Sequence, residues 1–259
     1  MTETNGKTVL VTGAARGIGK AIALAFAAER NRLVITGRTA VAIEKIAAEI
    51  RASGAEVLAS PCDVTDKPQV TDLRHRIEKH FGTVQILVNN VGIAPAARFL
   101  DMSDNLWDEV MRVNVSAAYN CCKTFLPAMI DARWGRIINI ASTVARIAYP
   151  GISAYATSKH AILGLTRALA METARLGVTV NAVCPGYVNT ELTRENARRL
   201  AAKRGESVDQ ALALMAASCP QRRLIEPEEV AYVTLALASD RAVGITGQAI
   251  QVDGGAVMA

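Results

Sequence analysis

A glycine-rich turn between an apolar segment and a helix-forming segment constrains the fold of this chain more than any other feature. Residues 7–12 (K-T-V-L-V-T) are typical of a buried strand, and residues 20–29 are rich in helix formers. Between them, G-A-A-R-G-I-G at 13–19 carries three glycines in seven residues. Glycines let the backbone approach a phosphate closely, and a helix N-terminus offers that phosphate free N–H groups. The turn therefore predicts a phosphate site, although a tight turn without a ligand would use the same residues.

Apolar, β-branched segments alternate with helical patterns along the rest of the chain. Strands are expected at 7–12, 33–36, 56–60, 85–88, 136–140, 178–183 and 248–253. This order predicts an α/β Rossmann fold, a doubly wound seven-stranded parallel sheet with helices on both faces, in a single domain over residues 1–259. The polar and glycine motifs follow the strand C-termini, which form the edge where open α/β sheets bind ligands.

Residues 191–225 depart from this alternation, because they form a long, charged and helical stretch. Since the stretch lies beside the ligand edge, we predict that it forms a helical lid. A solvated amphipathic helix pair would show the same pattern. Seven cations make the stretch basic on balance: Arg194, Arg198, Arg199, Lys203, Arg204, Arg222 and Arg223.

Composition and charge exclude several classes of protein. The net charge of +5 comes from dispersed basic residues without interleaved aromatics, which favours anionic small molecules over nucleic acid. The five cysteines and three histidines show no metal-ligand spacing, so we expect no metal and free thiols in a reducing compartment. The polar segment 1–7 lacks signal-peptide character, and the apolar run 21–28 is far short of the ~18 residues of a membrane span. We therefore expect a cytoplasmic protein that does not bind membranes.

A tyrosine and a lysine four residues apart point to acid–base chemistry. Tyr155 and Lys159 lie in a helical pattern, where residues i and i+4 share a face. A nearby positive charge favours the phenolate, so the ammonium would bring the phenol's pKa of about 10 closer to neutrality. Ser142 follows the strand 136–140, and a Pro-Gly turn at 150–151 can fold its hydroxyl back onto the phenol. The alternative is a solvated helix face that carries the same pair.

An arginine after the second strand predicts which nicotinamide cofactor would bind. Dinucleotide folds that bind a free ribose 2′-OH carry an acidic residue at this point, but here strand 33–36 is followed by Gly37 and Arg38. Arg38, helped by Arg16, could pair with a 2′-phosphate through charge-assisted hydrogen bonds. The pattern favours NADP(H) and leaves NAD(H) possible. A solvent-facing loop arginine is the alternative.

Two other polar residues admit more than one role. Asp63, which follows the third strand, could bind an adenine amino group with Val64 against the ring. Alternatively, Asp63 or Thr65 caps the next helix, and both roles can hold together. Asn114 lies among apolar neighbours within the helical pattern 104–131. Because a buried asparagine needs hydrogen-bond partners, it is either structural or kinks the helix around a water.

Together these motifs resemble the short-chain dehydrogenase/reductase family over essentially the whole chain, from Thr12 to Gly255. Their order, spacing and strand positions match jointly, which is far more specific than any single motif. Val91 departs from the alanine usual in the family and would crowd the cofactor slightly. The matching motifs are T-G-A-A-R-G-I-G at 12–19, D-V at 63–64, N-N-V-G at 89–92, Asn114, Ser142, Y-A-T-S-K at 155–159 and P-G-Y-V-N-T at 185–190.

The resemblance implies hydride transfer between a nicotinamide cofactor and a carbonyl or secondary alcohol. Tyr155 would be the general acid in reduction or the base in oxidation, and Ser142 would hydrogen-bond the substrate oxygen. Lys159 would bind the nicotinamide ribose and lower the pKa of the phenol, while Asn114 would anchor a water that links Lys159 to solvent. The expected cofactor-binding residues are Gly13, Arg16, Gly17, Ile18, Gly19, Arg38, Asp63, Val64, Asn90, Gly92, Tyr155, Lys159, Pro185, Gly186, Val188 and Thr190, the last two holding the carboxamide.

The substrate is less constrained. Within the family the chain is similar to 3-oxoacyl-thioester reductases and polyketide ketoreductases, notably at 180–188 and in the long lid. A basic lid would suit the phosphopantetheine arm of coenzyme A or acyl carrier protein. One alternative is an NAD(P)-dependent secondary-alcohol, hydroxyacyl or hydroxysteroid dehydrogenase. Another is an inactive NADP-binding scaffold, against which the intact set of Asn114, Ser142, Tyr155 and Lys159 argues.

The resemblance also implies a homotetramer or a homodimer. Small residues recur along the helix expected over 153–176, and they would permit helices of two subunits to pack closely. These residues are Ala154, Ala161, Gly164 and Ala168.

Overall fold

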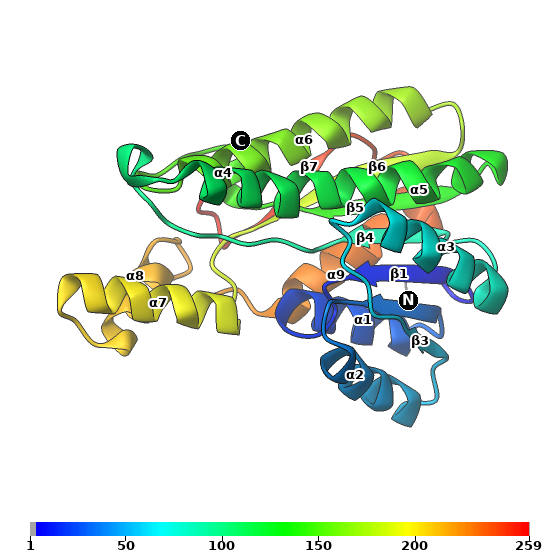
Figure 1. Ribbon diagram of the computed structural model, residues 1–259, viewed down its shortest axis with the longest axis horizontal. Helices are drawn as coiled ribbons and strands as arrows, with labels where there is room; N and C mark the ends of the chain where they lie inside the picture. The colour runs from blue at the N-terminus through cyan, green and yellow to red at the C-terminus, as the bar shows by residue number, and fades with distance from the viewer. Residues whose placement is uncertain (1–3, 259) are drawn as a thin grey trace.

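One seven-stranded parallel sheet forms the centre of the computed structural model, which describes residues 4–258 (Figure 1). Residues 1–3, part of the polar N-terminal segment, and residue 259 lie outside the described residues. The sheet confirms the predicted Rossmann arrangement, and its strand boundaries lie within two residues of those expected. In sheet order the strands are β3 (Val57–Ala59), β2 (Arg32–Thr36), β1 (Thr8–Thr12), β4 (Ile86–Asn89), β5 (Gly135–Ile140), β6 (Val178–Pro185) and β7 (Ala249–Val252).

Helices cover both faces of the sheet, as Figure 1 shows. The helices α1 (Gly17–Ala28), α2 (Ala40–Ala52) and α9 (Pro227–Ala238) bury their apolar residues in one core cluster. On the other face, α3 (Lys67–Phe81) and α5 (Ala117–Asp131) bury theirs in a second cluster, and α6 (Ser153–Thr173) contributes to a third. Because both faces are covered, every residue of β1, β4, β5 and β6 is buried, as parallel sheets require.

The order of the strands places two functional segments side by side. From β1 the chain proceeds outward to β2 and β3, and then returns to β4 on the other side of β1. Such a reversal is the point at which open α/β sheets bind ligands. The glycine turn follows β1, and residues 90–92 follow β4. Both segments therefore lie at the carboxyl edge next to the reversal.

The helical pattern predicted over 104–131 forms three consecutive pieces. A single π-helical turn, η2 (Arg112–Ser116), separates α4 (Asp104–Met111) from α5. A π turn holds one residue more than an α-helical turn and is frequent at functional sites. Asn114 lies in the middle of η2 and is buried. The interruption therefore falls at the asparagine that we expected to be structural or to kink the helix.

Two helices extend from the body at the place where a lid was predicted (Figure 1). They are α7 (Glu191–Arg204) and α8 (Val208–Ala217), and we refer to residues 191–217 as the lid. The two helices pack on each other through Ala197, Ala201, Ala211 and Met215. The chain then returns to the body, where Ile225 pairs with Val188 in an isolated bridge.

The start of α3 differs from the expectation. Asp66 caps this helix, because its carboxylate accepts the Gln69 N–H at 3.3 Å. The prediction that Asp63 or Thr65 is the cap was therefore wrong. A turn closed by the Asp66 N–H on the Asp63 carbonyl comes first and moves the helix start along the chain.

The remaining short elements are three 3-10 turns: η1 (Phe99–Asp101), η3 (Thr143–Ala145) and η4 (Asp240–Ala242). Within residues 4–258, no helix combines the length and the apolar character that crossing a membrane requires.

Candidate active site

The three glycines of the turn 13–19 lie at positions where a side chain would be crowded. Gly13 and Gly17 have positive φ angles of 65° and 53°. A Cβ on Gly19 would lie 2.3 Å from the Gly13 carbonyl oxygen and 2.5 Å from Asn90 Nδ2. The first turn of α1 carries no acidic residue, and no side chain caps its N–H groups. The turn therefore offers a bare backbone and a free helix N-terminus, which fits a dinucleotide phosphate.

Asn90 joins the two segments at the reversal of the sheet. Its Nδ2 donates to the carbonyls of Thr12 at 3.0 Å and Gly13 at 3.1 Å. Its backbone N–H donates to Thr12 Oγ1, which in turn donates to the Val88 carbonyl. Val91 Cγ2 would lie 3.1 Å from a Cβ on Gly13, so the valine packs toward the glycine turn. These contacts fix the shape of the turn from the side of β4.

The predicted adenosine site contains a polarised carboxylate and an exposed arginine. Asp63 accepts both the N–H (2.9 Å) and the hydroxyl (2.8 Å) of Thr65. Burial raises the pKa of the Asp63 carboxyl, but these bonds and the charges of Arg38 and Arg112 outweigh burial and hold the pKa below its usual value. Arg38 is exposed at the end of β2. Val64 is buried in the core beside Asp63.

Arg16 contacts the lid. Its Nη1 lies 3.8 Å from Glu195 Oε1 of α7, and the arginine side chain is 70% exposed. Gly17 also faces the lid, because a Cβ there would lie 3.1 Å from Thr190 Cγ2. Thr190 caps α7 by accepting the Thr193 N–H. The glycine turn and the start of the lid are therefore in contact.

Ser142 and Tyr155 meet as the sequence predicted. Ser142 caps η3 after β5, and Tyr155 lies in the first turn of α6. Burial raises the pKa of the Tyr155 phenol, and the hydrogen bond with Ser142 lowers it only in part. The expectation that Lys159 lowers this pKa below its ordinary value was therefore wrong for this structure, where burial outweighs the other influences. The phenol is protonated at neutral pH.

Lys159 lies behind the phenol as a buried ammonium. Its Nζ donates to the Ile140 carbonyl at 2.8 Å and lies 5.8 Å from the centroid of the Tyr155 ring. Burial lowers the pKa of Lys159 to about 8, against a smaller opposing influence of Cys184. The ammonium therefore titrates close to neutrality.

Asn114 is held on three sides. Its Oδ1 accepts the Ile93 N–H at 2.8 Å, and its Nδ2 donates to the Ile93 carbonyl and to Ser158 Oγ, both at 2.9 Å. Gly92 separates it from Lys159, because a Cβ there would lie 3.4 Å from Asn114 Oδ1 and 3.5 Å from Lys159 Nζ. The partners of the buried asparagine are thus protein groups on two other segments.

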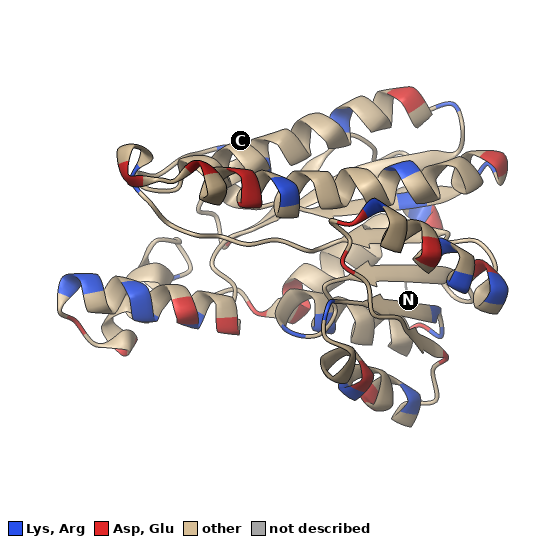
Figure 2. Ribbon diagram, viewed as in Figure 1, with Lys and Arg blue, Asp and Glu red and all other residues tan. Residues whose placement is uncertain are grey.

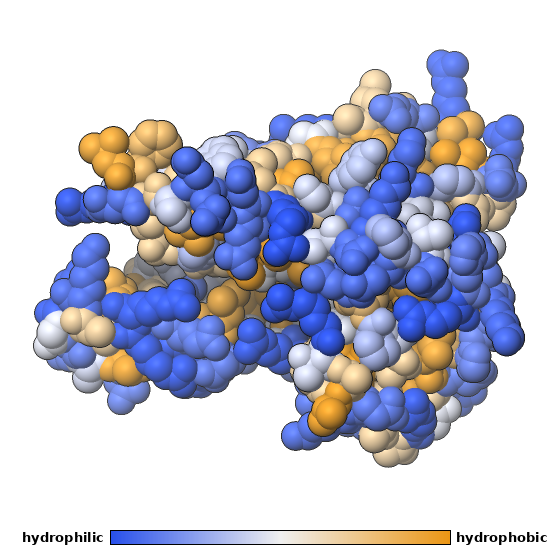
Figure 3. Space-filling view, in the orientation of Figure 1, coloured by the Kyte–Doolittle hydropathy of each residue, from blue (hydrophilic) through white to orange (hydrophobic). Residues whose placement is uncertain are grey.

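A cavity of about 650 Å³ opens onto this cluster. Figure 3 shows the molecule hollowed between the lid and the part above it, with hydrophobic surface facing the hollow. Ser142 and Tyr155 lie in its wall, together with Ile18 of the glycine turn. The segment after β6 contributes Pro185, Gly186, Val188 and Thr190 to the same wall.

Sequence reasoning missed several cavity residues. Arg98 and Tyr149 come from loops on one side, and Cys219 and Asp253 come from the side of the lid. Arg98 could have been found from the rule used for the other motifs, because the loop 93–98 continues from the carboxyl end of β4. Asp253 could have been found from the same rule, because it follows the carboxyl end of β7. Cys219 gave no such signal, since it reaches the cavity only through the packing of the segment after α8.

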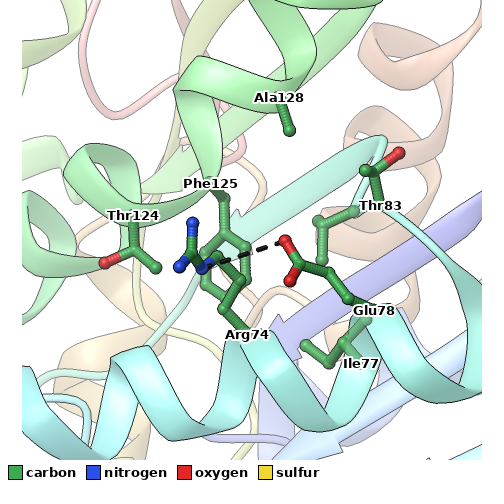
Figure 4. A pocket seen from close by; sticks show the side chains of 8 residues that line it. Arg74, Ile77, Glu78, Thr83, Thr124, Phe125 and Ala128 are labelled. Carbon is green, nitrogen blue, oxygen red and sulfur yellow. Dashed lines mark ion pairs between the residues drawn. The ribbon is translucent and has the colours of Figure 1, made fainter.

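A second cavity of about 10 Å³ lies between α3 and α5, at the opposite edge of the sheet (Figure 4). The Arg74–Glu78 ion pair, at 3.8 Å, joins two residues of α3 that line it. It has room for about one water. Its lining residues are Arg74, Ile77, Glu78, Thr83, Val84, Thr124, Phe125 and Ala128.

Among residues 4–258, no three His, Cys, Asp or Glu side chains are placed to hold a metal ion. All five cysteines are free and buried.

Comparison with known proteins agrees with this geometry. The family described as short chain dehydrogenase matches residues 7–201. The chain is 39% identical to the 3-oxoacyl acyl-carrier-protein reductase FabG of Pseudomonas aeruginosa, over 98% of both chains. It is 38% identical to the D-beta-hydroxybutyrate dehydrogenase of Rhizobium meliloti, over 96% of this chain and 98% of that one.

A solved structure is similar over its whole length. A crystal structure of a variant of actinorhodin polyketide ketoreductase with NADPH has a TM-score of 0.94 and 33% identity to this chain, covering 99% of each. The chain therefore belongs to the short-chain dehydrogenase family, and it is an oxidoreductase that uses a nicotinamide cofactor.

Proposed function

We propose that this protein is an NADPH-dependent ketoreductase whose substrate is a 3-oxoacyl thioester of coenzyme A or acyl carrier protein, or a polyketide. The observation that carries the proposal is the meeting of Ser142 and Tyr155 in the wall of one large cavity, with Lys159 behind the phenol. Two of the similar proteins are named as reductases of such carbonyls, which supports this substrate class.

The bare glycine turn would hold the pyrophosphate of the cofactor, and Val188 and Thr190 would hold its carboxamide. When bound, the cofactor supplies a hydride. Tyr155 gives its phenolic proton to the carbonyl oxygen, and its raised pKa keeps that proton in place at neutral pH. Ser142 donates a hydrogen bond to the same oxygen and stabilises its developing charge. The Lys159 ammonium stabilises the phenolate that remains.

NADP(H) is the proposed cofactor because of Arg38. Within residues 4–258 this exposed arginine forms no recorded ion pair, and Arg16 has only a long contact with Glu195. Both are available to a 2′-phosphate. We expect NADPH to bind more tightly than NADH, and Arg38→Ala to weaken NADPH about tenfold, as for the loss of a charge-assisted hydrogen bond. Fluorescence titration measures both affinities; equal affinities in the wild type would contradict the assignment.

Cations at the cavity rim support a substrate with an anionic arm. Arg98, Arg199 and Lys203 line the cavity, and none of them forms an ion pair in the part of the chain that the structure describes. Figure 2 shows the charged residues along α7. On the same helix, Arg198 is paired with Glu191 at 2.7 Å and Arg204 with Glu206 at 2.9 Å. Of the α7 cations without an ion pair, Arg199 and Lys203 thus line the cavity, whereas Arg194 donates to Asn189 Oδ1 instead.

This division provides a matched control on one helix. Neutralising Arg199 and Lys203 together to Gln should raise the KM of a 3-oxoacyl-CoA about fivefold or more, since each rim charge contributes roughly 0.2–1 kcal/mol. The KM of a small uncharged 3-keto ester should not change. The control replaces Arg198 and Arg204 by Gln and should leave both values unchanged. If both double variants raise the KM of the 3-oxoacyl-CoA equally, or if neither raises it, the claim that Arg199 and Lys203 bind an anionic arm is contradicted.

A second candidate is an NAD(P)-dependent dehydrogenase of hydroxy compounds, favoured by the 38% identity to a hydroxybutyrate dehydrogenase. A small hydroxy acid carries its carboxylate close to the reacting carbon. However, the wall segments 140–152 and 185–188, which surround Ser142 and Tyr155, contribute no charged residue to the cavity. Oxidation of 3-hydroxybutyrate that is faster than reduction of any 3-oxoacyl thioester would favour the second candidate. Turnover of either compound would exclude an inactive scaffold.

A further inference from the structure

Ser158 joins two segments that carry proposed catalytic residues. Its side chain is fully buried. Its Oγ accepts from Asn114 Nδ2 at 2.9 Å and donates to the Tyr155 carbonyl at 2.7 Å. One hydroxyl therefore links the π turn η2 to the first turn of α6.

The link completes the hydrogen bonds of the Asn114 amide. An amide has two N–H donors and one carbonyl acceptor group. The Ile93 carbonyl accepts from one of these N–H groups, and Ser158 Oγ accepts from the other. The Ile93 N–H donates to the amide oxygen. Because Asn114 is almost fully buried, loss of Ser158 Oγ would leave an N–H without a partner. The amide would then be free to shift.

A shift of this amide would reach Lys159. Asn114 Oδ1 and Lys159 Nζ lie on the same side of Gly92, in contact with the space that a Cβ there would fill. Tyr155, whose carbonyl holds Ser158, is one turn before Lys159 on α6. Ser158 thus contacts both Asn114 and the backbone of the helix that carries Tyr155 and Lys159.

We propose that Ser158 is a positioning residue. It holds the Asn114 amide in place relative to Tyr155 and Lys159, and so keeps proton transfer to the phenol fast. The inference rests on the proposed function, because it assigns Ser158 to the proton step of that reaction. It requires no contact between Ser158 and substrate or cofactor. Ser158 acts only through Asn114 and the helix backbone.

Thr166 provides a matched control on the same helix. It is also buried, its Oγ1 donates to the Ile162 carbonyl at 2.7 Å, and it accepts from Asn139 Nδ2 at 2.9 Å. It therefore bridges a buried asparagine to α6 just as Ser158 does, but two turns away from Lys159. A hydroxyl that only supports the helix should behave alike at both positions.

The kinetic test compares Ser158→Ala with Thr166→Val. We expect Ser158→Ala to lower kcat about tenfold while KM stays within about twofold, because one misplaced hydrogen bond slows the proton step and not binding. The solvent deuterium isotope effect on kcat should rise. Thr166→Val should lose a similar amount of thermal stability and keep the wild-type kcat and isotope effect.

Hydrogen exchange tests the same inference without any substrate. The Ile93 N–H is bound to Asn114, so its exchange should accelerate in Ser158→Ala and not in Thr166→Val. The experiment distinguishes the proposed reaction from the proposed role of Ser158. If exchange is faster in Ser158→Ala but the wild type reduces no ketone, the proposed reaction is contradicted and the role of Ser158 in holding Asn114 is not.

The opposite results would overturn the proposal. These are wild-type kcat and wild-type exchange at Ile93 in Ser158→Ala, or an equal loss of kcat in both variants. If Ser158→Ala does not fold, Ser158→Cys takes its place with the same two outcomes, because a thiol fills the space but is a weak hydrogen-bond partner.

Discussion

Lys159 is the residue on which the acid–base balance of the site depends. It is an ammonium enclosed by protein, with one carbonyl partner and no carboxylate partner among the described residues. Burial lowers its pKa from 10.5 to about 8. The same burial raises the pKa of Tyr155. The two shifts move the two pKa values apart, so Lys159 loses its proton at a lower pH than Tyr155 does.

The Lys159 shift predicts how stability depends on pH. Below about pH 8 the lysine is charged in both the native and the unfolded state, and the cost of burying the charge is present in full. Between about pH 8 and 10.5 the native state releases its proton first, so this cost is relieved and the contribution to stability rises with pH. Lys159→Met removes the charge at every pH.

The variant should therefore be more stable than the wild type by a larger margin at about pH 7 than at about pH 9.5. Urea unfolding midpoints of the two proteins at both pH values measure the margin. A margin that widens toward high pH would contradict a lowered pKa of Lys159.

The sequence could predict which polar residues form the site, because their types and strand-end positions carry the chemistry. It could not predict their partners. Asn114 is satisfied by Ile93 and Ser158, which are 21 and 44 residues away along the chain. The sequence also could not predict the raised pKa of Tyr155, since the burial that raises it depends on the packing of the whole cavity wall.

The glycine turn and α1 form the element that the cofactor would contact. Gly19→Ala would push a methyl group into the Gly13 carbonyl and Asn90. We expect this change to lower the free energy of unfolding by about 1–3 kcal/mol and to abolish NADPH binding, because the start of α1 must move. Thermal unfolding and fluorescence titration measure the two effects.

Gly244→Ala is the matched control. A Cβ on Gly244 would meet nothing within 4 Å, and its φ is not in the left-handed region. Alanine there should change the free energy of unfolding by no more than about 0.5 kcal/mol and leave NADPH binding unchanged. Tolerance of alanine at Gly19 would contradict the close approach of backbone at the turn.

For helices and strands, the sequence pattern predicted the strands well, because buried parallel strands are short, apolar and bounded by turns. It was wrong where local rules compete. Asp63, Thr65 and Asp66 are all good caps, and only the turn at 63–66 selects Asp66. The break at η2 was marked by one polar residue in an apolar helix, but its π geometry depends on contacts with distant segments.

In the whole molecule, the sheet brings residues from distant parts of the chain together at one edge. The reversal between β1 and β4 brings the glycine turn to Asn90, and β5 and β6 add Ser142 and Pro185 beside them. The lid lies beside the same edge and supplies Arg199 and Lys203 of the rim. In the proposed reaction, the cofactor, the proton donor and the substrate arm would lie at three different parts of this edge.

The central claim is that Tyr155 gives a proton to a carbonyl reduced by NADPH. The most direct test is the rate of NADPH oxidation with a 3-oxoacyl-CoA, measured for the wild type and Tyr155→Phe together with NADPH titration of both. The account predicts turnover by the wild type, a loss of at least about 100-fold in kcat for the variant, and NADPH affinities within about twofold of each other. Undiminished turnover by Tyr155→Phe would contradict it.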